Sequence, residues 1–210
     1  MNLVLLHETD RRGGDEFVLA DARAEHIRGV LRAAPGDTLR VGLLEGPCGA
    51  AEVLEAGARD VRLRAVLTGP PPPRACVDLV VAIPRPRMLR RLLPQVAALG
   101  VDRLVLLRTW RVEKPYLTAA VLRPEVYRPL LSAGLMQARS TRETRVTVEP
   151  LFRPFAEDRA PALAHGAAAV VAHPGSPRAL ADAVPAGAGR RVYAVGPEGG
   201  FLPFEVGLLE

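Results

Sequence analysis

The sequence is poor in lysine, cysteine and aromatic residues, and it has no long apolar run. Its two cysteines form no CxxC motif and have no histidine at metal-ligand spacing, so we predict neither a disulfide framework nor a metal site. No segment approaches the roughly 20 apolar residues of a membrane span, and the N-terminus lacks the pattern of a signal peptide. We therefore expect a cytoplasmic protein with no membrane partner.

The chain is nevertheless rich enough in apolar residues to fold. Hydrophobic residues make up 49% of the 210 residues and charged residues 24%, which argues against disorder. The 19 glycines and 20 prolines indicate many turns. This length exceeds one small domain, so we expect a small module joined to a medium one.

Positive charge is concentrated in the middle of the chain. Residues 74–159 contain 16 basic and 8 acidic side chains, a surplus of 8, while the whole chain has a net charge of +5. All of these basic residues are arginines except Lys114, the only lysine in the sequence. The planar fork of arginine donors matches phosphate, so the concentration favours RNA or DNA as a partner. An arginine-rich genome is the alternative explanation.

Four consecutive prolines, residues 70–73, predict a stiff linker between two domains. In residues 1–69, short strands are predicted at 38–44, 50–54 and 61–67 and a helix at 25–33, which fits a compact β-barrel with one helix. Arg28 and Arg32 lie four apart in that helix, where both could contact a phosphate backbone; a solvated helix face is the alternative.

Residues 74–210 alternate between apolar strands and amphipathic helices. Strands are predicted at 77–83, 104–107, 146–148, 168–172 and 191–195, and helices at 88–99, 123–138 and 178–183. This alternation is typical of a parallel sheet covered on both faces. Ligands of such sheets bind beyond the carboxyl ends of the strands.

Two of these strand ends carry candidate ligand-binding turns. The first turn contains His173, Pro174 and Gly175, and the second contains Gly196, Pro197, Glu198, Gly199 and Gly200. Glycine permits positive φ and leaves backbone amides bare, so a nucleotide or nucleoside could lie there. The second turn is neither a Walker loop nor GxGxxG, and an ordinary tight turn explains it equally well. A hydrogen-bonded loop residue is the alternative for His173.

Seven segments in order resemble the RsmE family, which methylates N3 of a uridine in bacterial 16S ribosomal RNA with S-adenosylmethionine. They are HIRGVLRAAPGD (26–37), AIPRPRMLRRLLPQVAALGV (82–101), LLRTWRVEKPY (106–116), GLMQARSTRETRV (134–146), LFRPFAEDRAPAL (151–163), VAHPG (171–175) and VGPEGGFLPFEV (195–206). The resemblance implies an α/β protein with an N-terminal PUA-like RNA-binding β-barrel at 1–69. It also implies a C-terminal SPOUT methyltransferase domain of trefoil-knot type, with a parallel sheet, at 74–210.

The resemblance also implies functional residues and partners. Both candidate turns fall where the family binds S-adenosylmethionine, and the expected RNA-facing residues are Arg28, Arg32, Arg85, Arg87, Arg90, Arg91, Arg139, Arg142 and Arg145. The partners would be 16S rRNA or the small ribosomal subunit, and a second copy bound through the C-terminal domain. No catalytic base is identified, and for Glu198 a structural role is the prediction.

The family continues into a further strand and a loop of the type LGxRILRxETA, whereas this sequence stops at Glu210, within a helix predicted to begin near Pro203. We therefore expect Phe201, Leu202, Phe204 and Leu208 to need cover from a second subunit. One alternative function is an RNA-binding module without catalysis, if the chain ends at Glu210. Another is a phosphate-handling nucleotide enzyme, which the missing Lys-Ser/Thr disfavours.

Overall fold

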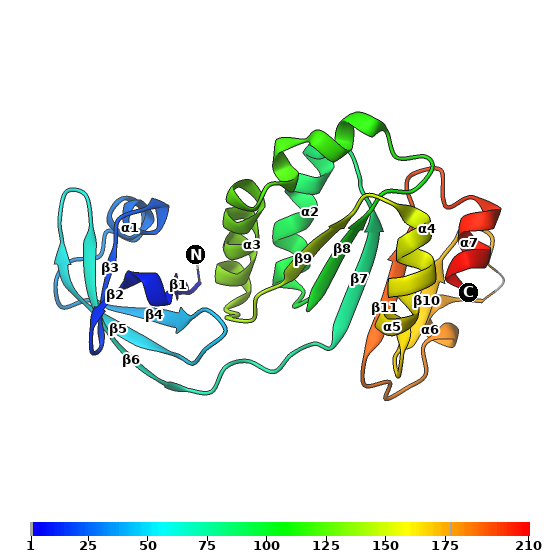
Figure 1. Ribbon diagram of the computed structural model, residues 1–210. Coiled ribbons are helices and arrows are strands. Elements are labelled where there is room, and N and C mark those ends of the chain that lie inside the picture. The colour runs from blue at the N-terminus through cyan, green and yellow to red at the C-terminus, as the bar shows by residue number, and fades with distance from the viewer. Residues whose placement is uncertain (1, 177) are drawn as a thin grey trace. The chain divides into compact units, whose positions relative to one another are not determined.

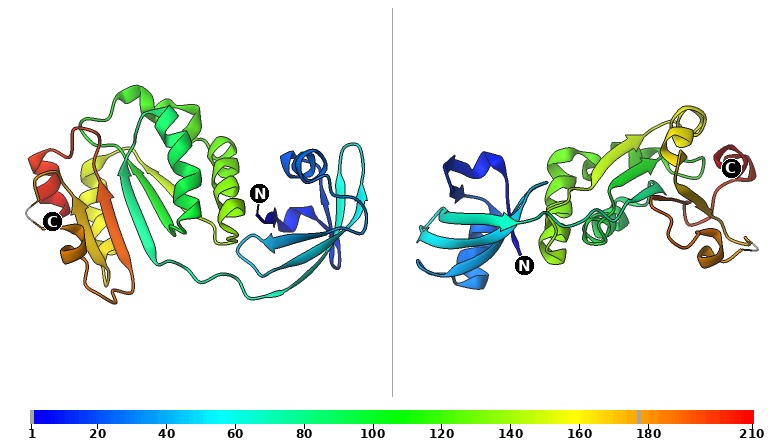
Figure 2. Two further views of the ribbon diagram at one scale, coloured as in Figure 1. Left: turned by 180° about the vertical axis from the view of Figure 1, so that it is seen from behind. Right: turned by 90° about the horizontal axis from the view of Figure 1, so that it is seen from below.

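The computed structural model describes residues 2–176 and 178–210, which divide into two compact units. The first unit contains the residues up to Pro73 together with Ser132–Glu143, and the second contains Arg74–Leu131 and Thr144–Glu210. Figures 1 and 2 show the strands of the first unit in blue and cyan and those of the second in green to orange. The unpaired linker that follows the last cyan strand includes the four prolines.

The first unit is a curled six-stranded sheet in the order β1-β4-β5-β6-β3-β2. Its strands are β1 (Val4–Leu6), β2 (Arg11–Gly13), β3 (Glu16–Leu19), β4 (Thr38–Leu43), β5 (Cys48–Ala56) and β6 (Val61–Gly69), with a single 3-10 turn, η1 (Glu8–Asp10). β1 pairs in parallel with β4, and the other pairings are antiparallel. The three predicted strands are confirmed. β1, β2 and β3 were not predicted, because strands of three or four residues are too short to show a clear alternation of apolar and polar residues.

Alternation along β6 positions the core of this unit. Val61, Leu63 and Ala65 are buried, while the intervening Arg62 and Arg64 are exposed and form ion pairs with acidic side chains of neighbouring strands. The buried residues pack against a cluster that includes Leu6, Phe17, Leu19, Ile27, Val41 and Val53. A strand with period-two burial of this kind covers one side of a sheet and leaves the other in water.

The predicted helix at 25–33 is present with different ends. α1 (Ala22–His26) begins after Asp21, whose side chain accepts a hydrogen bond of 2.9 Å from the Arg23 amide, and it continues as a π-helical turn, η2 (Ile27–Leu31). Arg32 then adopts a left-handed conformation with φ 53° and ends the helix. Arg28 and Arg32 therefore do not occupy successive turns of one regular helix.

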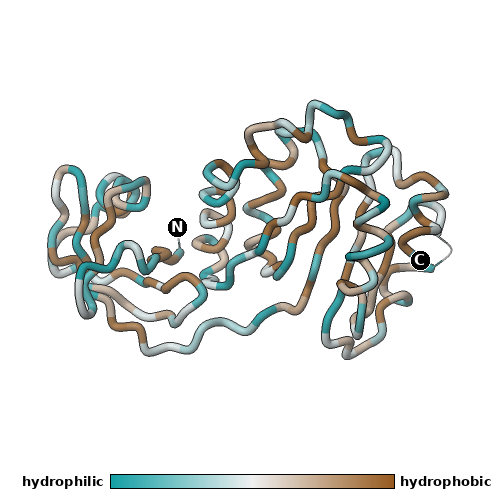
Figure 3. Tube along the Cα trace, in the orientation of Figure 1, coloured by the Kyte–Doolittle hydropathy of each residue, from teal (hydrophilic) through white to brown (hydrophobic). Residues whose placement is uncertain are grey.

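The second unit is a five-stranded parallel sheet in the order β10-β11-β7-β8-β9, as predicted. Its strands are β7 (Val77–Ala82), β8 (Arg103–Leu107), β9 (Arg145–Glu149), β10 (Ala168–Ala172) and β11 (Arg191–Val195). The helices that begin in this unit are α2 (Pro86–Ala98), η3 (Lys114–Thr118), η4 (Ala120–Leu122), α3 (Pro124–Ala138), α4 (Phe152–Pro154), η5 (Phe155–Arg159), α5 (Ala160–Ala164), α6 (Leu180–Ala183) and α7 (Pro203–Leu209). The part of α3 from Ser132 onward groups with the first unit. Figure 3 shows hydrophobic residues along β7 and β8.

Both faces of this sheet are covered, which confirms the predicted layering. Val80, Val105 and Val192 form a core with Phe155 of η5 and Phe201. Leu104 and Leu106 alternate with Val105 along β8, so they are buried on the opposite face of the sheet. The helix α2, which buries Leu89 and Leu93, lies on that face in Figures 1 and 2. The helical turns of residues 152–164 were not predicted, because Pro154 and Pro161 interrupt the helical pattern there.

The two units together match the predicted class, a barrel-like sheet followed by a parallel α/β domain. The trefoil knot stays a prediction. Among the described residues, no helix is both long and apolar enough to cross a bilayer.

Candidate functional site

The two candidate turns leave the sheet side by side. β10 and β11 are parallel neighbours with Ala172 opposite Val195, so the turns at 173–175 and 196–200 begin at the same level. A Cβ built on Gly200 would lie 3.5 Å from Pro174 Cδ and 3.8 Å from His173 Cε1. The structure therefore brings together the two groups of residues that the sequence placed 21 or more positions apart.

The second turn depends on glycine at two positions. Gly200 donates a 2.7 Å hydrogen bond to the Pro197 carbonyl and has φ 73°, a conformation that strains other residues. A Cβ on Gly196 would lie 2.9 Å from the Phe201 amide nitrogen, too close for any side chain. The Phe201 side chain is 2% exposed and belongs to the core beneath the sheet. The expectation that Phe201 needs cover from a second subunit is therefore wrong, because its own domain buries it.

Arg111 and Glu205 hold the second turn from two sides. Arg111 Nη1 donates hydrogen bonds to the carbonyl of Gly199 and, at 3.2 Å, to that of Gly200. Glu205 is fully buried, and its two carboxylate oxygens accept from the amides of Trp110 at 2.7 Å and Leu202 at 2.8 Å. These contacts fix the loop after β8 to the segment after β11. Sequence reasoning assigned no role to either residue, although the segment LLRTWRVEKPY contains Arg111 and the segment VGPEGGFLPFEV contains Glu205.

The surface of the two turns is largely open to solvent. His173, Pro174, Gly175, Glu198 and Gly199 are exposed, and a Cβ on Gly175 would meet no atom within 4 Å. Backbone bare of side chains can approach a flat ligand closely. The Glu198 carboxylate makes no hydrogen bond or ion pair with the described residues, so the structural role predicted for it is not seen there. Among the described residues, no three His, Cys, Asp or Glu side chains are placed to hold a metal ion.

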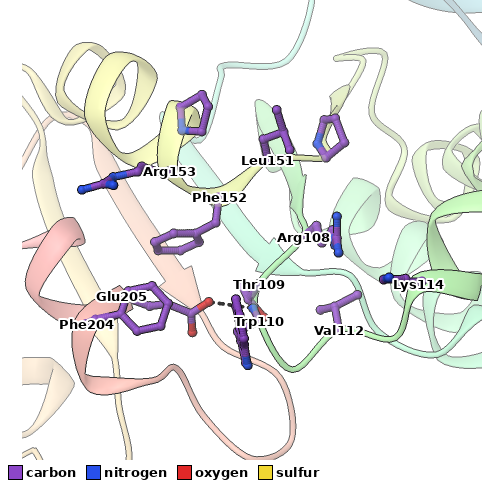
Figure 4. A pocket seen from close by; sticks show the side chains of 12 residues that line it. Arg108, Thr109, Trp110, Val112, Lys114, Leu151, Phe152, Arg153, Phe204 and Glu205 are labelled. Atoms are coloured by element: carbon purple, nitrogen blue, oxygen red, sulfur yellow. Dashed lines mark hydrogen bonds between the residues drawn. The ribbon is translucent and has the colours of Figure 1, made fainter.

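A cavity of about 490 Å³, here called the aromatic pocket, lies at the same edge of the sheet (Figure 4). Trp110 and Phe204 meet edge to face with ring centroids 6.4 Å apart, and Phe152 meets Phe204 at 6.3 Å. Trp110 is 78% exposed and Phe204 52% exposed. The other lining residues are Arg108, Thr109, Val112, Lys114, Pro150, Leu151, Arg153, Pro154 and Glu205. No sequence pattern indicated this pocket, since its residues come from three segments far apart in the sequence: the residues after β8, those after β9 including α4, and the start of α7.

The predicted RNA-facing arginines are divided among three places. Arg85, Arg87, Arg90 and Arg91 are exposed at and after the start of α2, beyond the carboxyl end of β7. Arg145 is exposed at the amino end of β9, the opposite edge of the sheet. The first unit contains the remaining four, Arg28, Arg32, Arg139 and Arg142.

Within the first unit, the arginines differ in how free they are to bind RNA. Arg32 and Arg139 are exposed, both with positive φ. Arg142 donates 2.7 Å to the Pro72 carbonyl and lies 3.7 Å from the Glu45 carboxylate. One terminal nitrogen of Arg28 is buried without a partner among the described residues. Arg32 and Arg139 are therefore the most accessible of the four, whereas Arg142 must give up contacts within the unit to bind a phosphate.

A charged cluster, here called the arginine network, occupies the amino edge of the sheet. Asp78 is fully buried, and its Oδ2 accepts from Arg103 at 2.5 Å and Arg190 at 2.7 Å. Arg74 donates 3.0 Å to Asp102, which is also buried. Burial raises the pKa of Asp78, but the hydrogen bonds from Arg103 and Arg190 outweigh burial and hold that pKa below its ordinary value.

Comparison with known proteins identifies related sequences. Residues 71–210 match the family model described as an RNA methyltransferase domain. The ribosomal RNA small subunit methyltransferase E of Treponema pallidum (strain Nichols) is 30% identical over 157 residues, which are 74% of this chain and 59% of that protein. The chain thus spans less than two thirds of the length of this curated relative.

Solved structures share the fold at low sequence identity. A ribosomal RNA small subunit methyltransferase E from Neisseria gonorrhoeae, bound to S-adenosyl methionine, has a TM-score of 0.79 at 17% identity and aligns over 100% of this chain and 84% of that one. A Legionella pneumophila protein with the bound cofactor SAM has a TM-score of 0.75 at 16% identity, over 99% of this chain and 84% of that one. The family model covers more than half of the sequence, and the resemblance to RsmE proteins is confirmed, so this chain belongs to the RNA methyltransferase domain family.

Proposed function

We propose that the protein methylates N3 of a uridine in 16S ribosomal RNA, using S-adenosylmethionine as methyl donor. The observation that carries the proposal is the meeting of two glycine- and proline-containing turns at the carboxyl edge of adjacent parallel strands. This edge is where open α/β sheets bind ligands. The names of the Treponema and Neisseria proteins support methylation of small-subunit ribosomal RNA, and the cofactor in the Neisseria and Legionella structures supports the donor.

In this proposal the two turns hold the cofactor. The residues in contact would be His173, Pro174, Gly175, Gly196, Pro197, Glu198, Gly199 and Gly200. When bound, S-adenosylmethionine supplies a methyl group on a sulfonium, which needs neither a metal nor a covalent enzyme intermediate. The chain contributes position: Arg111 and Glu205 fix the turns, and Phe201 anchors them in the core.

The RNA substrate must present its base unpaired. N3 of uridine lies on the Watson–Crick edge and carries a proton, so a paired uridine cannot reach a methyl donor. We assign phosphate contacts to Arg28, Arg32, Arg85, Arg87, Arg90, Arg91, Arg139, Arg142 and Arg145. The proposed domains are an RNA-binding barrel at 1–69, a linker at 70–73 and a methyltransferase domain at 74–210. A cytoplasmic location is part of the same proposal, since bacterial ribosomal RNA is found there.

Calorimetric titration with S-adenosylmethionine tests the cofactor site. Gly199→Val adds a Cβ only 3.1 Å from Arg111 Nη1, and we expect binding at least tenfold weaker, a loss of about 1.4 kcal/mol. Gly207→Val is the matched control, because a Cβ at Gly207 in α7 meets no atom within 4 Å. Equal affinity in all three proteins would move the cofactor away from these turns. RNA binding without cofactor binding would favour the RNA-binding module instead.

The homodimer is part of the proposal. Its support is the family resemblance, which implies a second copy bound through the C-terminal domain. Sedimentation velocity of the intact chain should give a dimer, and a fragment that begins at Arg74 should give one as well. A monomer at every accessible concentration would refute this part of the proposal.

A further inference from the structure

We infer that the aromatic pocket binds an extruded pyrimidine base of single-stranded RNA, with the base stacked on the Trp110 indole. This inference rests on the proposed function, because the bound base would be the one presented to the two turns. Arg111 connects the sites: it follows Trp110 in the loop after β8 and hydrogen-bonds the carbonyls of Gly199 and Gly200.

The Trp110 side chain is exposed although its backbone is held in place. Its indole is 78% exposed, while its amide donates 2.7 Å to the fully buried Glu205. Phe204 meets the indole at an interplanar angle of 86°, so it supports the ring from one side without stacking face to face on it. A flat aromatic surface that is fixed and open to solvent is the form in which proteins stack unpaired bases.

Charge at the pocket favours RNA over the cofactor. Arg108 and Lys114 line it, and neither forms an ion pair with the described residues. The only acidic side chain of the lining, Glu205, has both oxygens occupied by backbone amides, and Arg153 is paired with Glu157 at 2.7 Å. The uncompensated positive charge attracts a phosphate and repels a sulfonium cation. The pocket therefore suits the nucleotide and the two turns suit the cofactor.

Size and polarity agree with a base. The volume of about 490 Å³ falls within the range of roughly 300–1,000 Å³ typical of small-molecule sites. Arg108 and Lys114, which also line the pocket, carry only hydrogen-bond donors. Uracil carries two carbonyl oxygens, which are acceptors for such donors.

The fluorescence of the intact protein tests the inference directly, because Trp110 is the only tryptophan in the chain. Short oligouridine should quench the emission, since stacking places a base against the indole. Heparin, an anion without bases, and S-adenosylmethionine should leave the emission nearly unchanged. Equal quenching by heparin would show that the pocket recognises charge alone, and quenching only by S-adenosylmethionine would assign the pocket to the cofactor. Either result overturns the inference.

Variants separate stacking from charge, with anisotropy of a labelled oligouridine as the readout. Trp110→Ala should weaken RNA binding about tenfold. The slope of log affinity against log salt should stay unchanged, because the indole carries no charge. Trp110→Phe should restore most of the affinity. Leu99→Ala is the control, since Leu99 is 77% exposed in the same unit and lies outside the pocket.

The proposed function and this inference can fail separately. Loss of S-adenosylmethionine binding at the turns, with oligouridine quenching intact, would remove the methyltransferase assignment and keep the base site. If S-adenosylmethionine binds at the turns but Trp110→Ala binds RNA as well as the wild type does, the inference is wrong and the proposed function stands.

Discussion

The two edges of the parallel sheet use charge in opposite ways. At the amino edge, the buried carboxylates of Asp78 and Asp102 are surrounded by Arg74, Arg103 and Arg190, and these arginines are engaged in pairing. At the carboxyl edge, the buried Glu205 binds backbone amides and the buried Glu149 pairs with Arg159, but Arg108 and Lys114 at the aromatic pocket form no ion pair with the described residues. One edge is closed by its own ion pairs, and the other leaves cationic and aromatic groups open to a ligand.

This difference shows why an arginine count does not locate an RNA surface. The surplus of positive charge in residues 74–159 includes arginines that neutralise buried aspartates as well as arginines with no partner among the described residues. Only unpaired arginines gain a contact when a phosphate arrives, whereas paired ones must give one up. The proposed RNA contacts on α2 are therefore better candidates than Arg103 or Arg190.

The largest expected effect comes from opening the arginine network. Asp78→Ala leaves the guanidinium groups of Arg103 and Arg190 without their shared carboxylate. Removing one partner of a buried pair is strongly destabilising, and because both arginines are partly hydrated we expect a loss of about 3 kcal/mol in the free energy of unfolding. Urea denaturation followed by circular dichroism measures it. Glu157→Ala, which breaks an exposed pair with Arg153, should cost at most about 1 kcal/mol. Equal losses in both variants would contradict the comparison.

A smaller effect is expected at the carboxyl edge from Glu205→Gln. The glutamine side chain keeps one carbonyl oxygen as an acceptor. Its NH₂ group faces the backbone amide of either Trp110 or Leu202, so one charge-assisted hydrogen bond is lost. We expect a loss of about 2 kcal/mol in the free energy of unfolding and a shifted Trp110 emission, because the loop is released. A loss equal to that of Asp78→Ala would mean that both edges depend equally on a buried charge.

Acid should weaken the amino edge within a defined range of pH. The pKa of Asp78 in the folded protein lies below its ordinary value of 3.8, so its contribution to stability is fully present above 3.8 and is lost as pH falls through the folded pKa. The stability difference between the wild type and Asp78→Ala should therefore shrink between pH 5 and pH 2. Urea midpoints at both pH values measure it, and a difference that grows on acidification would reverse the assigned pKa shift.

The smallest effects concern single phosphate contacts. Arg87→Ala on α2 should lower the slope of log RNA affinity against log salt by about one unit and leave S-adenosylmethionine affinity unchanged. Arg145→Ala removes one arginine at the amino edge, where the proposal also assigns a phosphate contact. A reduced slope for Arg87→Ala alone would confine RNA to the carboxyl edge, and no change in either variant would leave both residues as solvated surface.

Local patterns predicted the sheet of the second unit well. Apolar runs bounded by glycine and proline gave the strands at 168–172 and 191–195 with the observed ends, because each strand is flanked by turn residues. The same turn residues indicated where a ligand could bind. Prediction succeeded wherever the cause of the structure lay within a few neighbouring residues.

The missed features depend on contacts far apart in the sequence. Glu205 meets the Trp110 amide across 95 positions, and Arg111 meets Gly199 across 88. Nothing near Trp110 in the sequence distinguishes an exposed indole from a core residue, since exposure is decided by where Phe204 and Phe152 arrive. The aromatic pocket therefore required the structure.

The composition of the first unit has a consequence for synthesis of the chain. Residues 132–143 group with the barrel, where the Thr141 side chain donates 2.9 Å to the Gly46 carbonyl and the Glu143 amide donates 2.6 Å to Glu45. At roughly 5–20 residues per second, the ribosome adds the stretch from Pro73 to Glu143 in about 4–14 s. During that interval the barrel strands have been made but these partners of the β4–β5 turn have not. The N-terminal unit is thus completed only after the first two strands of the parallel sheet have left the ribosome.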